Sequence, residues 1–338
     1  MKRMVARVFL AVFALSLFAV CGVSTPGAAA EGEYKFSKDI VFVVPGAAGS
    51  SFGAYVEMFK IVAEKNGHFD HNIIVEYRPG ATGMIGMNYM FARPHDGYTV
   101  VLAASNPEYL VATNQAETFD QYTYVGVGSF GFEQCVLVTA ADSPFNNIDD
   151  VIAFARENPG QLNWGSSGTL GTLHFFALQV MRSAGIEVNY VPFGNAVGTN
   201  TAAAAGDIQV GGTMHSGSLA LVEAGQTKHL AQGGLQRNAA IPDIPSVFES
   251  PDLPIENFVG PFGDHRGIIA PAATPPEVLA AWDKLLYDVV HDPEYQAWGA
   301  SLPGCDLSQF MTGAALTEHM RNSTVKLTEL FKEMFPDG

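Results

Sequence analysis

The amino-acid sequence predicts an α/β protein in which helices pack in layers on largely parallel sheets. Runs of β-branched and aromatic residues alternate with amphipathic helical periods, which is the pattern of such folds. Hydrophobic residues make up 48% and charged residues 15% of the chain, a composition typical of globular proteins. The 338 residues suffice for two lobes or one large domain, since a domain commonly holds about 100–200 residues.

The charge balance argues against a nucleic-acid partner. Lys and Arg number 18 and Asp and Glu 34, which gives a net charge of −16. A chain this acidic is repelled by phosphate backbones and by anionic lipid headgroups. We therefore expect no nucleic acid among its partners.

The first thirty residues have the three parts of a secretion signal. Three basic residues lie between positions 2 and 7, an apolar run covers positions 8–20, and small residues end the segment at Ala30. The apolar run is shorter than the ~18–20 residues of a membrane-spanning helix. We expect residues 1–30 to be a signal peptide cleaved near Ala30. Cleavage leaves 15 basic and 34 acidic residues, a net charge of −19.

The three cysteines leave alternatives open. Cys21 weakly resembles a lipoprotein anchoring site, but Val20 is not the small residue that usually precedes such a cysteine. The mature chain keeps Cys135 and Cys305, which in an oxidising compartment form either one bridge or two free thiols. Because no Cys/His spacing typical of zinc is present, we expect no metal and no cofactor.

Strands and helices are predicted from hydrophobic periodicity. From Phe52, and again from Leu173, apolar residues recur at offsets 3, 4 and 7, which predicts two amphipathic helices. In the C-terminal part, Pro275 and Pro276 open a helix before residues 278–290, and a second helix is expected over about 308–335. Runs typical of strands cover residues 40–44, 73–77, 98–103, 122–127, 135–139, 188–191 and 208–210.

Two glycine-rich loops each connect a strand to a helix. The first covers residues 45–51 and precedes the helix from Phe52; the second covers residues 165–172 and precedes a helix that contains His174. Small residues let backbone amides approach a ligand, and the positive end of the following helix attracts an anion. Neither loop carries a nucleotide-binding signature. Together the loops predict two helix N-termini that face one anionic ligand.

One enzyme alternative remains open at the first loop. Residues 49–53 read Gly-Ser-Ser-Phe-Gly and fit Gly-x-Ser-x-Gly, the nucleophile elbow of α/β-hydrolases, with Ser51 as the nucleophile. The elbow usually follows several strands, whereas this segment lies at the first strand-to-helix turn of the mature chain. A serine hydrolase is therefore the weaker hypothesis.

A series of motifs gives a more specific indication. In chain order they include VPGAAG at 44–49, EYRPGATG at 76–83, WGSSGT at 164–169, PDIPS at 242–246 and APAATPP at 270–276. Their order over about residues 38–280 resembles that of the extracytoplasmic solute receptors of tripartite tricarboxylate transporters, the Bug-type receptors.

The resemblance implies a fold and a function. The fold would be a two-lobed periplasmic binding-protein fold, type II-like, with a ligand cleft between the lobes. Residues 31–132 and 256–338 would form lobe 1, and residues 133–255 lobe 2. A non-enzymatic, monomeric receptor in the periplasm would bind a di- or tricarboxylate or related small organic acid and deliver it to the permease subunits of a tripartite tricarboxylate transporter. A ligand sensor for a signalling partner is the alternative within this fold.

The resemblance also implies which residues bind the ligand. In this family the loops of the two lobes hold a carboxylate largely through backbone amides. That function carries over to Ala47, Ala48, Gly49, Ser50 and Ser51 in the first lobe and to Ser166, Ser167, Gly168, Thr169 and His174 in the second.

Departures from the family pattern add candidate site residues. Phe52 and Phe193 are either apolar walls of the site or members of the core of their own lobes. After the Val-Pro-aromatic motif, many members of the family have a basic residue and then a glycine, whereas this chain has Gly194 and Asn195. His215 is either a pocket residue or a structural histidine.

Two arginines are candidates for a second ligand carboxylate. Arg266 offers a guanidinium that matches a carboxylate with two hydrogen bonds, although a salt bridge to Asp264 or another acid explains it equally well. Arg78, which precedes Pro79 and Gly80, is expected to be structural.

Overall fold

The computed structural model describes residues 34–46, 48, 50–103, 106–117, 119–239, 241–259, 262–302 and 304–335. Residues from Tyr34 onward group into one compact unit. The predicted signal peptide lies outside the described residues. In the part of the chain that is described, no helix is long and apolar enough to cross a membrane.

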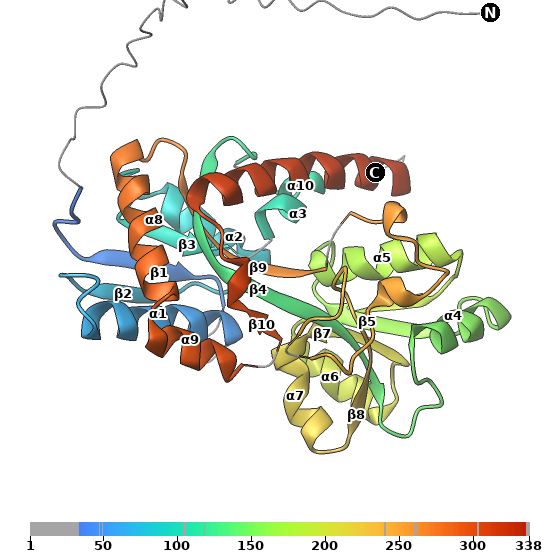
Figure 1. Cartoon of the computed structure of the whole chain (residues 1–338). Helices are drawn as coiled ribbons and strands as arrows, with labels where there is room; N and C mark the ends of the chain where they lie inside the picture. Colours follow the sequence, from blue (N-terminus) through green and yellow to red (C-terminus); the bar gives the residue numbers. More distant parts are fainter. Residues whose placement is uncertain are drawn as a thin grey trace, which may run out of the picture. The chain divides into compact units, whose positions relative to one another are not determined.

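Strands and helices alternate along most of the chain (Figure 1). The strands are β1 Ile40–Val44, β2 Ile73–Tyr77, β3 Thr99–Leu102, β4 Tyr124–Ala140, β5 Asn163–Ser167, β6 Asn189–Phe193, β7 Val210–Met214, β8 Thr227–Gln232, β9 Gly263–Pro271 and β10 Cys305–Asp306. The helices are α1 Ser51–Lys65, α2 Met84–Phe91, α3 Asn106–Ala112, α4 Ile148–Glu157, α5 Thr172–Ala184, α6 Ala196–Ala205, α7 His215–Glu223, α8 Pro276–Val290, α9 Pro293–Ala300 and α10 Gly313–Met334.

The described strands form one sheet in the order β2-β1-β3-β9-β4-β7-β5-β6, with β8 and β10 also paired to β4. The pairs at the two ends, β1 with β2 and β3 and β5 with β6 and β7, are parallel. All pairs that involve β4 or β9 are antiparallel. The α/β prediction is confirmed, but the sheet is mixed rather than largely parallel, because two long antiparallel strands join its parallel ends.

Strand β4 corrects the prediction of two separate strands over 122–127 and 135–139. It runs unbroken for 17 residues. The glycines between the predicted strands read as a turn, yet Gly128 and Gly131 adopt positive φ angles of 145° and 135° inside the strand. The register against β9 shifts at Gly126/Gly128 and at Ser129/Phe132, so the glycines form bulges and the strand continues.

Residues on alternate sides of each strand enter different hydrophobic clusters, as the two-residue period of a strand requires. Phe42 and Val44 of β1 pack with α1, α8 and α9, whereas Val43 packs with α2 and α10. Leu137 of β4 packs with α4 and α5, whereas Val138 packs with α6. The sheet is therefore covered by helices on both faces at each end.

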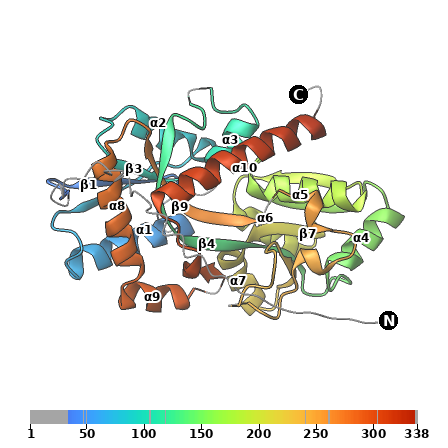
Figure 2. The same ribbon diagram turned by 45° about the horizontal axis from the view of Figure 1, so that its top comes forward.

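Strands β4 and β9 lie between the two parallel ends of the sheet. The first half of β4 pairs with β9, from Tyr124 opposite Pro271 to Gln134 opposite Gly263, and the second half pairs with β7 and β8. Figure 2 shows α10 running from the β9 side toward α5, and Leu327 of α10 clusters there with Phe175 of α5. Residues from distant parts of the sequence therefore meet along β4 and β9.

The starts of α1, α5 and α8 agree with the sequence prediction to within a residue. The helix expected from Phe52 begins at Ser51, and the helix expected from Leu173 begins at Thr172. Helix α8 begins at Pro276, directly after Pro275. The final helix begins at Gly313 rather than 308, because Thr312 caps it and a short 3-10 helix, Leu307–Gln309, comes before it.

Candidate functional site

The first glycine-rich loop ends in a capped helix. The Ser50 hydroxyl accepts a hydrogen bond from the Gly53 amide, 3.4 Å away, and so caps α1. Ala48 is exposed. Ala47, Gly49 and the Ser51 side chain lie outside the described part, so their predicted contacts are not located.

Some polar groups of the second glycine-rich loop form hydrogen bonds within the protein. Gly168, with φ of +77°, donates its amide to the Phe193 carbonyl at 2.9 Å. Ser166 is buried, and its hydroxyl bonds to the Tyr190 hydroxyl. Ser167 is half-buried and Thr169 exposed. This hydrogen bond of the Gly168 amide joins the loop to the end of β6, and the predicted ligand-binding function of Gly168 stays a prediction.

His174 forms a hydrogen bond with the backbone of the second glycine-rich loop. Its Nδ1 accepts a hydrogen bond from the Leu170 amide at 2.9 Å, and its ring stacks on Tyr190 with 4.0 Å between centroids. Burial lowers the pKa of His174 to about 4, so the imidazole is neutral at pH 7. These contacts support a structural function for His174.

The remaining predicted residues are in the second half of the sheet. Phe193 packs against the cluster around α6, and Asn195 caps that helix by accepting a hydrogen bond from the Gly198 amide at 2.9 Å. His215 begins α7, is 2% exposed and lies 5.2 Å from the His229 ring. Its ring closely faces Gly304, where an added Cβ would lie 2.6 Å from Nδ1. Asn195 is thus a helix cap, and His215 faces the C-terminal segment of the chain.

A buried ion cluster lies where β4 pairs with β9. We define it as Glu133, Asp264 and Arg266. Arg266 is 0% exposed, forms an ion pair with Glu133, and has Asp264 at 3.7 Å. Burial lowers the pKa of the Arg266 guanidinium from its usual value, but the group stays protonated near neutral pH.

The first turns of three helices contact this ion cluster. From α1, the Phe52 ring lies 4.5 Å from the Arg266 guanidinium carbon. From α5, the Thr172 hydroxyl donates to Asp264 at 3.0 Å. From α7, the Ser216 amide donates to Glu133 at 3.3 Å, and the Ser216 hydroxyl bonds to the same oxygen. The first turns of three helices therefore meet at the ion cluster, and their positive ends favour negative charge there.

Sequence reasoning missed Glu133, Thr172 and Ser216. Glu133 had a signal, because it is the one charged residue in the apolar sequence of β4. Thr172 ends the second glycine-rich loop but was not singled out there, and Ser216 had no signal, since hydroxyl residues are common at helix starts. Arg266 forms the salt bridge that was one of its two interpretations, with Glu133 as the partner, and its pairing with a ligand carboxylate stays a prediction. Arg78 likewise forms an ion pair with Glu76 and is structural.

The two cysteines of the mature chain do not form a bridge. Cys135 and Cys305 are both free thiols, Cys135 being buried and Cys305 half-buried. Among the described residues, no group of three or more His, Cys, Asp or Glu side chains could hold a metal ion.

Comparisons with known proteins agree with this architecture. The family described as the tripartite tricarboxylate transporter family receptor, TctC, matches residues 59–323. A UPF0065 protein of Cupriavidus necator is 26% identical over 258 residues, 75% of each chain.

Two solved structures share the fold. A TctC solute binding protein from Polaromonas has a TM-score of 0.71 at 22% identity, over 88% of this chain and 99% of that one. MatC from Rhodopseudomonas palustris with bound malate has a TM-score of 0.72 at 16% identity, over 87% and 98%. The predicted solute-binding fold is confirmed. Because the family match spans most of the sequence, this chain belongs to the receptors of the tripartite tricarboxylate transporter family.

Proposed function

We propose that this receptor is exported to the periplasm, binds a small carboxylic acid beside the ion cluster, and delivers it to the permease subunits of a tripartite tricarboxylate transporter. The observation that carries the proposal is that the first turns of α1, α5 and α7 meet at the ion cluster, which contains the buried Arg266. Family membership supports the transport function.

The ligand would lie between two lobes. Lobe 1 would comprise residues 31–132 and 256–338, and lobe 2 residues 133–255, joined by β4 and the segment before β9. Phe52 approaches the ion cluster from lobe 1, and Thr172 and Ser216 approach it from lobe 2. A ligand that joins these groups would favour closure of the lobes, because closure exchanges the hydration of a carboxylate for preorganised amides.

We propose a dicarboxylate as the ligand class. One carboxylate would bind amides of the two glycine-rich loops, with Ala47, Ala48, Gly49, Ser50 and Ser51 on one side and Ser166, Ser167 and Thr169 on the other. The second would face Arg266, whose five N–H donors are not all used by Glu133, since Asp264 lies beyond hydrogen-bond distance at 3.7 Å. The malate in MatC, a dicarboxylate, supports this class.

The acids of the ion cluster limit the charge of the ligand. Glu133 and Asp264 place two carboxyl groups beside one guanidinium. A tricarboxylate carries one more carboxylate than a dicarboxylate. That extra negative charge would be buried near Glu133 and Asp264, where charges are poorly screened. We therefore expect dicarboxylates to bind more tightly than tricarboxylates.

Further parts of the proposal concern processing and assembly. The signal peptide would be cleaved near Ala30, and the mature protein would act as a monomer without enzymatic activity. The family and the fold are those of solute-binding receptors, which supports a binding function rather than hydrolysis at Ser51.

Calorimetric titration tests the proposed function. Protein purified from the periplasmic fraction would be titrated with acetate, succinate, malate and citrate, and its N-terminus sequenced. We expect succinate or malate to bind most tightly, and Arg266→Lys to weaken that binding at least about tenfold, since lysine cannot make two parallel hydrogen bonds. Absence of binding by every acid at millimolar concentration would refute the proposal.

A further inference from the structure

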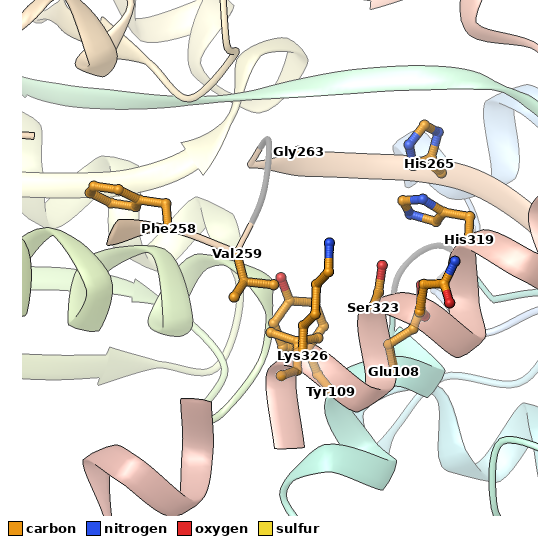
Figure 3. Close-up of a pocket in the computed structure, with 11 residues that line it drawn as sticks. Glu108, Tyr109, Phe258, Val259, Gly263, His265, His319, Ser323 and Lys326 are labelled. Carbon is orange, nitrogen blue, oxygen red and sulfur yellow. The ribbon is translucent and has the colours of Figure 1, made fainter. Parts of the chain in front are cut away.

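A cavity separate from the ion cluster lies between α3, β9 and α10. Its volume is about 370 Å³. Glu108 and Tyr109 of α3, His265 of β9 and His319, Ser323 and Lys326 of α10 line it (Figure 3). None of the residues that the sequence predicted for the ligand site lines this cavity.

His265, which lines the cavity, and Arg266 of the ion cluster point to opposite faces of β9. Successive side chains of a strand point to opposite faces, so His265 points away from its neighbours Asp264 and Arg266. The His265 ring packs instead against Phe132, with 4.8 Å between centroids, and against His319, at 4.7 Å. A molecule in this cavity would therefore contact His265 and not Arg266, which distinguishes it from a ligand of the proposed carboxylate site, and Asp264 is the member of the ion cluster that acts on Glu108.

The cavity wall contains polar groups whose bonding capacity is unused. Glu108 is 2% exposed, and its Oε2 has no hydrogen-bond partner among the described residues. The same holds for Nδ1 of His265, which is 7% exposed. Buried polar atoms in proteins are almost always paired, so two such atoms beside one cavity indicate a polar occupant.

The charges around the cavity define that occupant further. Burial raises the pKa of Glu108 well above its usual value and lowers the pKa of His265 to about 3. The His265 imidazole is therefore neutral at pH 7, and burial favours the protonated form of Glu108. Lys326, which forms no ion pair with any described residue, supplies a positive charge at the rim. In Figure 3 its ammonium group points into the space between Val259 and His319.

We propose that this cavity is a second binding site, for a small hydroxylated monocarboxylate. The carboxylate would pair with Lys326 and accept a hydrogen bond from Ser323. The hydroxyl group would reach the unpaired Glu108 Oε2 or His265 Nδ1, both of which it can match as donor or acceptor. A second carboxylate would lie near Glu108 and gain no cation, which excludes dicarboxylates from this site. The volume leaves room for a ligand of this size together with ordered water.

L-Lactate and glycolate serve as probes in calorimetric titrations. Lys326→Gln removes the cation from an exposed position, and Lys332→Gln is the matched control, an exposed lysine in the last turn of the same helix. We expect at least one probe to bind the wild-type protein and the Lys332→Gln variant alike. Lys326→Gln should weaken the binding about tenfold, as expected for loss of a charge-assisted hydrogen bond.

A second variant fills the cavity directly. Asn322 lies at the cavity and is exposed, so Asn322→Trp should fold and should abolish binding of the probe. A probe that binds all variants equally would occupy another site and would overturn the proposal, as would failure of both probes to bind the wild-type protein. Because Arg266→Lys leaves this cavity intact, loss of the dicarboxylate site and loss of this site are distinguishable.

Discussion

Replacing Arg266 by methionine would test whether the ion cluster is a buried, mutually dependent unit. Methionine keeps much of the volume but removes the positive charge that Glu133 and Asp264 share. The two acids would keep their hydrogen bonds from Ser216 and Thr172. Their negative charges would nevertheless face each other at side-chain exposures of 1% and 7%, without a cation.

The expected loss of stability follows from this burial. Removing one partner of a buried ion pair costs about 3–5 kcal/mol, because the other charge stays buried and uncompensated. Unfolding of about 300 residues has an entropy of roughly 0.6 kcal/mol/K, so that loss lowers Tm by about 5–8 °C. Thermal unfolding followed by circular dichroism at pH 7 would measure it.

Two controls make the result specific. Arg78→Met removes an ion pair whose arginine side chain is 42% exposed, and it should cost less than about 1 kcal/mol. Adding Glu133→Gln to Arg266→Met removes one of the unpaired charges and should restore part of the lost stability. If Arg266→Met melts within about 1 °C of the wild type, the ion cluster does not have the energetic importance inferred here.

Further predictions concern pH, backbone conformation, salt and reactivity. The pKa values of His174 and His229 are lowered to about 4, so each histidine contributes its full stability above pH 6.5, where it is neutral in both the folded and the unfolded chain. The free energy of unfolding should fall by about 2 kcal/mol per histidine by pH 5, because the unfolded chain then binds protons that the folded chain does not. A urea Cm that is equal at pH 7 and pH 5 would contradict this. Gly168→Val forces a β-branched residue to φ of +77°, which should lower stability by about 1–2 kcal/mol and weaken carboxylate binding. Gly171→Val, at φ of −107°, is the control and should be tolerated. Equal effects of the two substitutions would contradict the strain argument. Carboxylate affinity should change less than about threefold between 0.01 and 0.15 M salt, because neither glycine-rich loop contains a cation; a tenfold loss would indicate exposed cations instead. A fluorophosphonate should leave Ser51 unmodified by mass spectrometry, and stoichiometric labelling would revive the hydrolase hypothesis.

Local elements were predictable because their causes are local. The apolar offsets from Phe52 and Leu173 place α1 and α5 to within a residue, and Pro275 with Pro276 marks the start of α8. The order of motifs along the chain indicated the family, which the family match confirms.

The candidate site was predictable only in part. The two glycine-rich loops follow strands and precede helices, as expected, yet the Gly168 amide and the Ser166 hydroxyl have partners within the protein. Such pairings depend on β6, which lies beside β5 although more than twenty residues separate Ser166 from Tyr190. The ligand-binding function of the predicted loop residues stays a prediction.

The sequence by itself determined the starts of α1, α5 and α8, most strands, the acidic charge and the family, because periodicity, proline positions and motif order act over short stretches of chain. Only the tertiary structure decided that Glu133, Asp264 and Arg266 form one ion cluster and that His265, on the other face of β9, lines a cavity with α3 and α10. The physical reason is that the ion cluster depends on the register of β4 against β9, which brings together residues more than 120 positions apart, and the cavity depends on the packing of α3 and α10 against β9. The bulges at Gly128 and Gly131 shift that register, and their effect on pairing appears in no local pattern.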